Sequence, residues 1–333
     1  RSADALQRNK NEIIPTEMTF ETAQTIDSIQ VSLNAGGMNT INIVLAFVMY
    51  GVALGIKPKI FADVFRQPKS VILGMVCQFI LLPAFTFLLA LGFGKAISPM
   101  MALGMILVAS CPGGNISNFM SSLSKANIEL SVSLTAISTA LAVVMTPANF
   151  FIWGNLYLRY AEVASEIPTL SISLWDVFKT IFILLGIPLV LGILTSRFLP
   201  KVASALKKPF QWLSILFFIA MVVLAFWGNI NAFLQCIKYI FLVVLVHNIL
   251  ALLIGFSTAS AFRLPYKDRR TLTIETGIQN SGLGLMLLLG TDIFADFPPH
   301  GGMLVITAWW GVWHIVSGLT VSAIFNLTKK KNS

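Results

Sequence analysis

Long apolar runs separated by short polar connections make up the chain from about residue 39 onward. A helix of about 20 apolar residues crosses the hydrocarbon core of a bilayer, and unpaired backbone groups in lipid are too costly for other open structures. The runs predict nine spanning helices, at 39–56, 70–93, 98–124, 128–158, 172–196, 208–228, 233–262, 267–296 and 301–327. We therefore expect an all-α polytopic membrane protein.

Two of these runs are interrupted by glycines, amides and hydroxyls. The third contains the stretch from Cys111 to Asn118, and the eighth contains the stretch from Glu275 to Gly284. The interrupted runs lie five spans apart, an odd number, so equivalent helices of the two halves point in opposite directions. This pattern predicts an inverted-topology repeat with two broken, crossing helices, which is typical of a transporter site. The alternative is that the glycines only pack against neighbouring helices.

The ends of the chain are polar. Residues 1–38 mix acidic and apolar positions and predict an amphipathic interfacial segment outside the cytoplasm. Because no cleavable signal peptide is evident, we expect the first apolar run to direct insertion itself. Residues 328–333 form a basic tail that we expect in the cytoplasm.

Charge placement predicts the orientation of the spans. With the N-terminus outside and the C-terminus in the cytoplasm, sixteen of the 23 basic residues fall in cytoplasmic segments, and most acidic residues fall outside. The predicted location is therefore a cell membrane that the chain crosses several times.

Composition supports lipid as the main solvent. The chain is 56% hydrophobic and only 11% charged, with a mean hydropathy of +0.82, which excludes an ordinary water-soluble domain. The net charge of +9 does not indicate a nucleic-acid partner, because the basic residues lie in connections between spans. The three cysteines show no paired spacing, so neither a disulfide framework nor a zinc site is indicated.

Glu275 is the one acidic residue that we place within the hydrocarbon region. A carboxylate there needs a counter-charge or a cavity, since charging it costs at least ~2.5 kcal/mol. A bound cation is the favoured partner. The alternatives are a carboxyl group kept neutral by burial, or one paired with Arg269 or Arg270.

Hydroxyls and amides elsewhere favour an alkali cation. Ser131, Thr135 and Ser138 recur on one face of the fourth span, and the third span supplies Ser117 and Asn118. Neutral hard oxygens suit an alkali ion better than a transition metal. The hydroxyls could instead bond to their own helix, and Gln78 in the second span could be either a ligand or a contact between helices.

The breaks also suit an anion. A half-helix that begins at an unwound stretch presents free amide groups and a positive dipole end. Asn115 and Asn280 occupy comparable places in the two breaks. His314, which we take to be the one histidine well inside a span, either lines the substrate cavity or bonds to a neighbour in the core.

Three separated motifs carry a resemblance to a known family. They are Cys111-Pro112-Gly113-Gly114-Asn115-x-Ser117-Asn118, then Leu130-Ser131-x-x-x-Thr135-x-x-Ser138-Thr139, then Glu275-Thr276-Gly277-x-Gln279-Asn280. Their order and spacing resemble the bile acid:sodium symporter family over about 40–327. The ending Trp313-His314-x-x-Ser317-Gly318 is similar to the bacterial branch, which implies a protein of the bacterial inner (plasma) membrane. Relatives in that branch have an extra N-terminal span that residues 1–38 are too polar to supply.

The resemblance implies a core domain of helices within 70–158 and 233–327 that moves against a panel domain of helices within 39–56 and 172–228. It implies two Na⁺ sites, formed by Ser117, Asn118, Ser131, Thr135 and Glu275, and by Gln78, Glu275 and Gln279 with the backbone carbonyls of Thr276 and Ile278. It also implies substrate contacts from Asn115, Gly114, Asn280, Ser281 and His314.

The function that we predict is sodium-coupled symport of a small organic anion, such as a bile acid or a similar carboxylate or sulfonate, by alternating access. Two alternatives remain, a proton-coupled or exchange transporter of the same broken-helix type and a non-transporting anion receptor. We expect no enzyme activity, because no credible pair of nucleophile and base is present. The expected partners are the anion, sodium and the bilayer, and no oligomer is required.

Overall fold

The computed structural model describes residues 26–28, 35–56, 67–161, 178–179, 182–227, 230–290 and 299–330. Within these ranges the regular elements are helices. They are α3 (Ala35–Ala53), α5 (Pro68–Val76), η1 (Cys77–Leu81), α6 (Leu82–Phe93), η2 (Gly94–Ala96), α7 (Pro99–Ser110), α8 (Ile116–Leu123), α9 (Ile128–Tyr160), η3 (Phe182–Gly186), α11 (Ile187–Phe198), α12 (Pro200–Trp227), α13 (Ile230–Ala261), α14 (Tyr266–Gly277), α15 (Ser281–Gly290) and α16 (Gly301–Lys330). The expected all-α class is confirmed.

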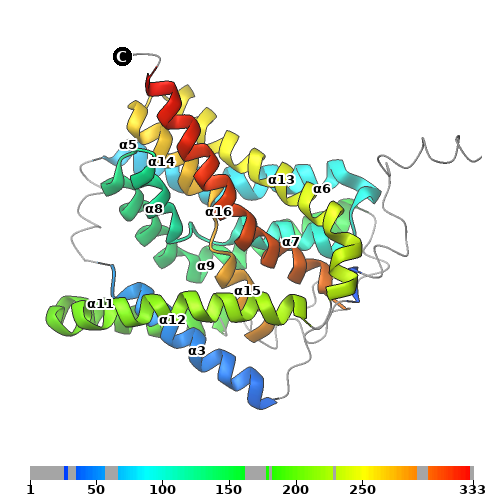
Figure 1. Ribbon diagram of the computed structural model, residues 1–333, viewed down its shortest axis with the longest axis horizontal. Coiled ribbons are helices and arrows are strands. Elements are labelled where there is room, and N and C mark those ends of the chain that lie inside the picture. The colour runs from blue at the N-terminus through cyan, green and yellow to red at the C-terminus, as the bar shows by residue number, and fades with distance from the viewer. Residues whose placement is uncertain are drawn as a thin grey trace, which may run out of the picture.

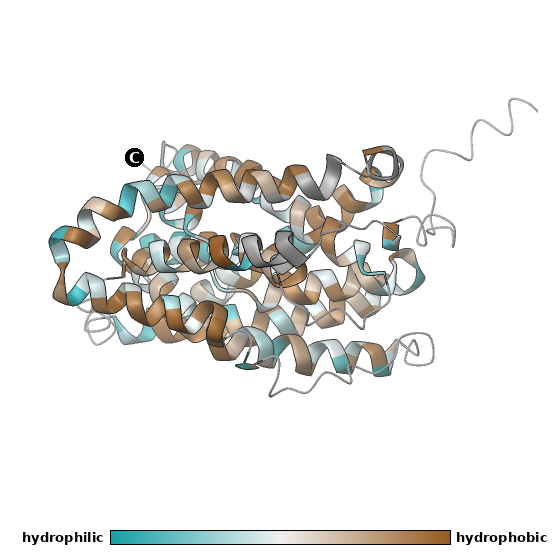
Figure 2. Cartoon of the chain, turned by 90° about the horizontal axis from the view of Figure 1, so that it is seen from below, coloured by the Kyte–Doolittle hydropathy of each residue, from teal (hydrophilic) through white to brown (hydrophobic). Residues whose placement is uncertain are grey.

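Among the described residues, four helical stretches are long and apolar enough to cross a membrane: Pro68–Ala96, Ile128–Tyr160, Cys236–Ala261 and Gly301–Leu327. Figure 2 shows that hydrophobic residues follow much of the length of the helices. Many of these side chains point outward, as Phe119, Phe198 and Leu234 do with 60%, 68% and 60% of their surface exposed. Such a surface suits lipid rather than water.

The two predicted interruptions are present. The third apolar run is divided into α7 and α8, and the eighth into α14 and α15. Local capping explains where several helices begin. Ser98 precedes α7 and accepts a hydrogen bond from the backbone N–H of Met101, with Pro99 at the first helical position. Asn127 caps α9 in the same way through the N–H of Leu130.

Other predicted bounds differ from the structure. The helix expected at 208–228 begins eight residues earlier, at Pro200, because proline suits a first helical turn and exposed basic residues are tolerated in that turn. Most of the interfacial segment expected at 1–38 lies outside the described residues. Of that segment, Ile26 is fully buried and the Asp27 carboxylate accepts a hydrogen bond from Ser98 Oγ at 2.8 Å.

The helices form two groups (Figure 1). α3 packs against α11 and α12, and these three helices lie along one side of the molecule. The second group includes α13 against α14 and α16 against α7. Gly255 of α13 makes the first of these contacts close, since a Cβ there would lie 2.5 Å from the carbonyl oxygen of Leu272.

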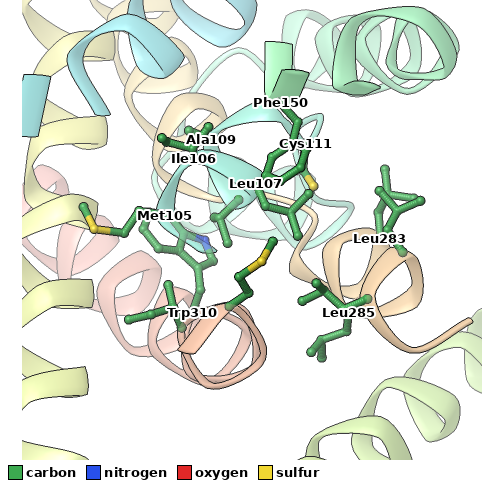
Figure 3. Close-up of a cluster of buried hydrophobic side chains, with 14 of the residues drawn as sticks. Met105, Ile106, Leu107, Ala109, Cys111, Phe150, Leu283, Leu285 and Trp310 are labelled. Carbon is green, nitrogen blue, oxygen red and sulfur yellow. The ribbon is translucent and has the colours of Figure 1, made fainter. Parts of the chain in front are cut away.

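A buried apolar cluster supports the first break. Figure 3 shows Met105, Leu107, Leu285 and Trp310 gathered from α7, α15 and α16, with Cys111 beside them at the end of α7. The last turn of α7 is therefore fixed by packing, and the chain unwinds directly after it.

Candidate functional site

The two unwound stretches lie against each other. The backbone N–H of Gly114 donates to the carbonyl of Ile278 at 2.8 Å, and the N–H of Asn280 donates to the carbonyl of Pro112 at 2.8 Å. Gly113 and Gln279 form an isolated antiparallel bridge. Segments more than 160 positions apart in the chain thus pair at the point where both helices are interrupted.

The carbonyls of the second break receive partners from outside their own helix. The Thr276 carbonyl accepts from Gln279 Nε2 at 2.8 Å, and the Gly277 carbonyl accepts from Asn248 Nδ2 of α13 at 2.7 Å. The N–H of Ser281 bonds to the Gln279 carbonyl, so the regular helical pattern does not continue across the break. Each donor satisfies a buried backbone group that the interruption frees.

The Glu275 carboxylate, on α14, receives three hydroxyl donors from two other helices. Ser117 Oγ and Ser131 Oγ donate to Oε2 at 2.6 and 3.2 Å, and Thr135 Oγ1 donates to Oε1 at 2.6 Å. Glu275 is 4% exposed. A buried carboxylate surrounded by hydroxyl oxygens, each with further lone pairs, is a set of hard ligands that can hold a cation.

No basic side chain in the described part of the chain neutralises Glu275. Arg269 Nε donates to the carbonyl of Leu264 at 2.7 Å, and Arg270 donates to the carbonyls of Ser124 and Phe325. Neither Arg269 nor Arg270 therefore forms the ion pair with Glu275 that the sequence left open as an alternative.

Gly113 makes room for this carboxylate. A Cβ at Gly113 would lie 2.5 Å from Glu275 Oε1, closer than any ordinary contact. Gly113, in the first break, therefore leaves the space that the Glu275 carboxylate occupies beside the second break.

Asn118 and Ser138 lie differently from their neighbours. Asn118 Oδ1 lies 3.4 Å from Thr135 Oγ1, which places the amide oxygen at the edge of the same cluster. Ser138 Oγ instead donates to the carbonyl of Thr135 in its own helix at 3.1 Å. Ser138 therefore bonds to its own helix, as the alternative interpretation of the sequence expected.

Gln78 and Gln279 form a second polar pair. Gln78 Nε2 donates to Gln279 Oε1 at 2.6 Å and to the Cys111 carbonyl at 2.8 Å, and Gln279 Nε2 lies 3.3 Å from Gln78 Oε1. Gln78 is placed by η1, a π-helical turn of the kind often found at functional sites. Within the described residues neither amide hydrogen-bonds to Glu275, although Gln279 follows it by one helical turn.

The two asparagines of the breaks occupy equivalent places. Asn115 directly precedes α8 and is exposed, and Asn280 directly precedes α15. Asn280 Oδ1 accepts from the N–H of Leu283 at 3.1 Å, so this side chain caps α15. Gly114 directly precedes Asn115, and its carbonyl accepts from the N–H of Ser117 at 2.9 Å.

Ser281 and His314 are buried, and within the described part of the chain Ser281 Oγ and both ring nitrogens of His314 have no hydrogen-bond partner. Such groups are costly unless something else satisfies them. The alternative of a core histidine bonded to a neighbour is therefore not what His314 forms in this structure.

Sequence reasoning missed two residues of α13. His247 is fully buried within the helix, so the expectation that His314 is the one histidine inside a span is wrong. The Nε2 atom of His247 lies 2.8 Å from Thr86 Oγ1, and the ring of His247 lies against Trp310. Asn248 supports the second break, as described above. The signal was a polar pair, His247-Asn248, inside a strongly apolar run.

Comparison with known proteins identifies the family. The model of the Sodium Bile acid symporter family matches residues 42–236. The chain belongs to this family. It is a family of multi-pass membrane transporters and not of enzymes, which confirms both the resemblance carried by the three motifs and the expectation that the chain is no enzyme.

Relatives of this member of the Sodium Bile acid symporter family come from bacteria and mammals. It is 32% identical over 291 residues to the "Uncharacterized sodium-dependent transporter YocS" of Bacillus subtilis, covering 87% of this chain and 84% of that protein. It is 26% identical over 293 residues to the "Sodium-dependent organic anion transporter" of Rattus norvegicus, covering 87% and 74%. The "Ileal sodium/bile acid cotransporter" of Cricetulus griseus is 29% identical over 273 residues, covering 81% and 73%.

Proposed function

We propose that this chain couples the inward movement of sodium to the uptake of a small organic anion, at the point where the two broken helices meet. One observation carries the proposal: the buried Glu275 carboxylate is surrounded by hydroxyls from α8 and α9 and has no basic partner among the described residues. A cation is the partner that would compensate this charge. The names of the relatives, which specify sodium dependence and organic anions or bile acids, support the same assignment.

The first of two proposed Na⁺ sites consists of Ser117, Asn118, Ser131, Thr135 and Glu275. The hydroxyls that donate to Glu275 also carry lone pairs, so a bound ion and the carboxylate can share them. Four of these five side chains are joined by the hydrogen bonds of 2.6–3.2 Å to Glu275, and Asn118 Oδ1 lies 3.4 Å from Thr135 Oγ1.

The second proposed Na⁺ site uses Gln78, Glu275 and Gln279 with the carbonyls of Thr276 and Ile278. The direct contact between the two glutamine amides supports the grouping of Gln78 with the second break. Since each amide oxygen and carbonyl has a second lone pair, ion binding does not require every existing hydrogen bond to break.

The organic anion is proposed to bind beside these ions, at Asn115, Gly114, Asn280, Ser281 and His314. α8 and α15 both begin at the crossing, and the N-terminus of a helix attracts negative charge. The unpartnered polar atoms of Ser281 and His314 provide donors or acceptors for its polar groups.

The proposed architecture has nine spans in an inverted repeat, with the N-terminus outside and the C-terminus in the cytoplasm of a bacterial cell. The core domain is assigned to helices within 70–158 and 233–327, and the panel domain to helices within 39–56 and 172–228. The packing of α3 with α11 and α12 supports this division. Alternating access then requires the core to shift against the panel while the site stays intact.

Flux measurements test this function. The purified chain is reconstituted in proteoliposomes, and uptake of radiolabelled organic anions, including a bile acid, is measured with an inward gradient of sodium or of potassium. We expect uptake with sodium alone, accelerated by an inside-negative potential because two Na⁺ accompany one monoanion.

Glu275→Gln is expected to abolish sodium-driven uptake while the protein still inserts and folds. Equal uptake under both gradients, or uptake driven by a proton gradient, would contradict sodium coupling. Binding of an anion without any flux would identify a receptor instead of a carrier.

A further inference from the structure

Arg270 is a buried cation without a carboxylate partner in the described part of the chain. It is 2% exposed and is among the largest fully buried side chains. Its Nη1 donates to the Ser124 carbonyl at 2.6 Å, and its Nη2 donates to the Phe325 carbonyl at 2.7 Å. Burying a guanidinium against neutral oxygens alone is costly, so the arrangement calls for an explanation.

The nearest acid in the sequence is already engaged. Asp268 accepts from Ser70 Oγ at 2.7 Å and from Asn127 Nδ2 at 2.9 Å. The charge of Arg270 is offset by the aromatic faces of Tyr266 and Phe325, which lie 4.6 and 5.2 Å from the guanidinium carbon, and by the carbonyl end of α8.

Each of the last carbonyl groups of α8, and that of Ser124 after it, has a hydrogen-bond partner. The carbonyls of Ser121 and Ser122 accept from the N–H groups of the turn that follows, and the Leu123 carbonyl accepts from Asn326 Nδ2 at 2.9 Å. The Ser124 carbonyl depends on Arg270. Because the last carbonyls of a helix have no partner within it, Arg270 supplies a contact that the helix cannot supply itself.

The opposite end of α8 carries Ser117, which donates to Glu275. α8 has eight residues and is therefore only ~12 Å long, so a tilt at one end moves the other. Arg270 and Glu275 belong to the same half-helix, α14. α8 and α14 are thus joined at both ends, by Ser117 with Glu275 at the crossing and by Arg270 with Ser124 at the far end.

We propose that Arg270 is a positioning residue for the cation site: by joining the C-terminal end of α8 to α14 and α16, it holds Ser117 against Glu275. Loss of its two hydrogen bonds lets α8 tilt and weakens sodium binding without removing a ligand. This inference rests on the proposed sodium-coupled function.

The test compares sodium-dependent thermal stabilisation of the purified full chain in detergent, with sodium chloride exchanged for potassium chloride at constant ionic strength. The unfolding temperature without sodium reports general stability, whereas the sodium concentration that gives half of the maximal shift reports the site. Arg270→Met removes the charge and both donors, and Arg270→Lys keeps the charge but cannot span both carbonyls. Arg269→Met is the matched control, since among the described residues the Arg269 side chain donates to the Leu264 carbonyl and not to α8.

We expect Arg270→Met to raise the half-stabilising sodium concentration by about tenfold or more, the usual effect of removing a residue that orients metal ligands. Arg270→Lys should raise it less, and Arg269→Met should leave it at the wild-type value. A wild-type sodium response in Arg270→Met overturns the inference. If Arg270→Met does not fold, a wild-type sodium response in Arg270→Lys overturns it instead. A wild-type chain that sodium fails to stabilise would instead refute the proposed function on which the inference rests.

Discussion

Ser117 Oγ donates to Glu275 Oε2 across 2.6 Å, although 158 positions separate the two residues. One residue lies just after the first helix break and the other just before the second. The contact therefore exists only because the two breaks meet. A change that separates the breaks should affect the site even when no ligand is removed.

Replacing Ser117 with Ala should weaken sodium affinity by about tenfold to a hundredfold, because a hydrogen bond to a charged group contributes about 1.5–3 kcal/mol and 1.4 kcal/mol is a factor of about ten. The half-stabilising sodium concentration measures this effect. Ser138→Ala is the matched control, since Ser138 is buried on α9 but bonds to its own helix. Equal sodium responses of the two variants would show that the contact between Ser117 and Glu275 does not determine sodium affinity.

Gly113→Ala should damage the site more than its small size suggests. The added Cβ would lie 2.5 Å from Glu275 Oε1, so either the carboxylate or the unwound backbone must move. We expect loss of sodium-driven uptake and a lower unfolding temperature. Gly92→Ala is the control, because a Cβ there meets nothing within 4 Å; this change should be neutral or slightly stabilising. Retained uptake in Gly113→Ala would contradict the close approach.

Gln78 and Gln279 should behave as a coupled pair. Each substitution by Leu removes the buried hydrogen bonds between the two amides, although each remaining amide keeps a backbone carbonyl partner, and should lower the unfolding temperature. Each single variant already removes the hydrogen bonds between the two amides. The double variant should therefore lower the unfolding temperature by less than the sum of the two single decreases. Additive decreases would mean that the amides do not depend on each other.

Asp27 should make stability depend on pH. Burial raises the pKa of this carboxyl from its ordinary value of 3.8 to about 7, against hydrogen bonds from Ser98 and from the backbone of Gly302 that lower the pKa. The folded state therefore holds the proton more tightly than the unfolded state. This contribution is complete below pH of about 4 and is lost as the pH rises through about 7.

The unfolding temperature of the wild type should fall over that interval by more than that of Asp27→Asn, which cannot titrate. Thermal unfolding in a series of buffers measures the difference. Parallel pH profiles for the two proteins would exclude Asp27 as the titrating group.

The sequence was most informative where chemistry and backbone breaks coincide. Glycines, a proline and amides interrupt two apolar runs, so the positions of both breaks could be predicted. Glu275 stood out as an acid within such a run. Its gathering with Ser117, Ser131 and Thr135 followed from the family resemblance, and hydrogen bonds in the structure join these residues.

Other features gave a weak signal in the sequence or none. The π-helical turn that places Gln78 depends on tertiary packing and has no distinctive composition. His247 and Asn248 gave only a weak signal, because one polar pair within an apolar run does not disturb the helical pattern and does not indicate its partners. The partners of Arg270 are backbone carbonyls of Ser124 and Phe325, which every residue possesses, so sequence alone could not assign them.

Direct binding of radioactive ²²Na⁺ to the purified chain tests the central claim, that the Glu275 carboxylate with its three hydroxyl neighbours holds sodium. Wild-type protein and Glu275→Gln, which keeps the size of the side chain but removes its charge, are compared with Ser138→Ala as the control. The account predicts saturable binding to the wild type and to Ser138→Ala, displaced by unlabelled sodium but not by potassium, and none to Glu275→Gln. Saturable sodium binding of wild-type affinity to Glu275→Gln would contradict it.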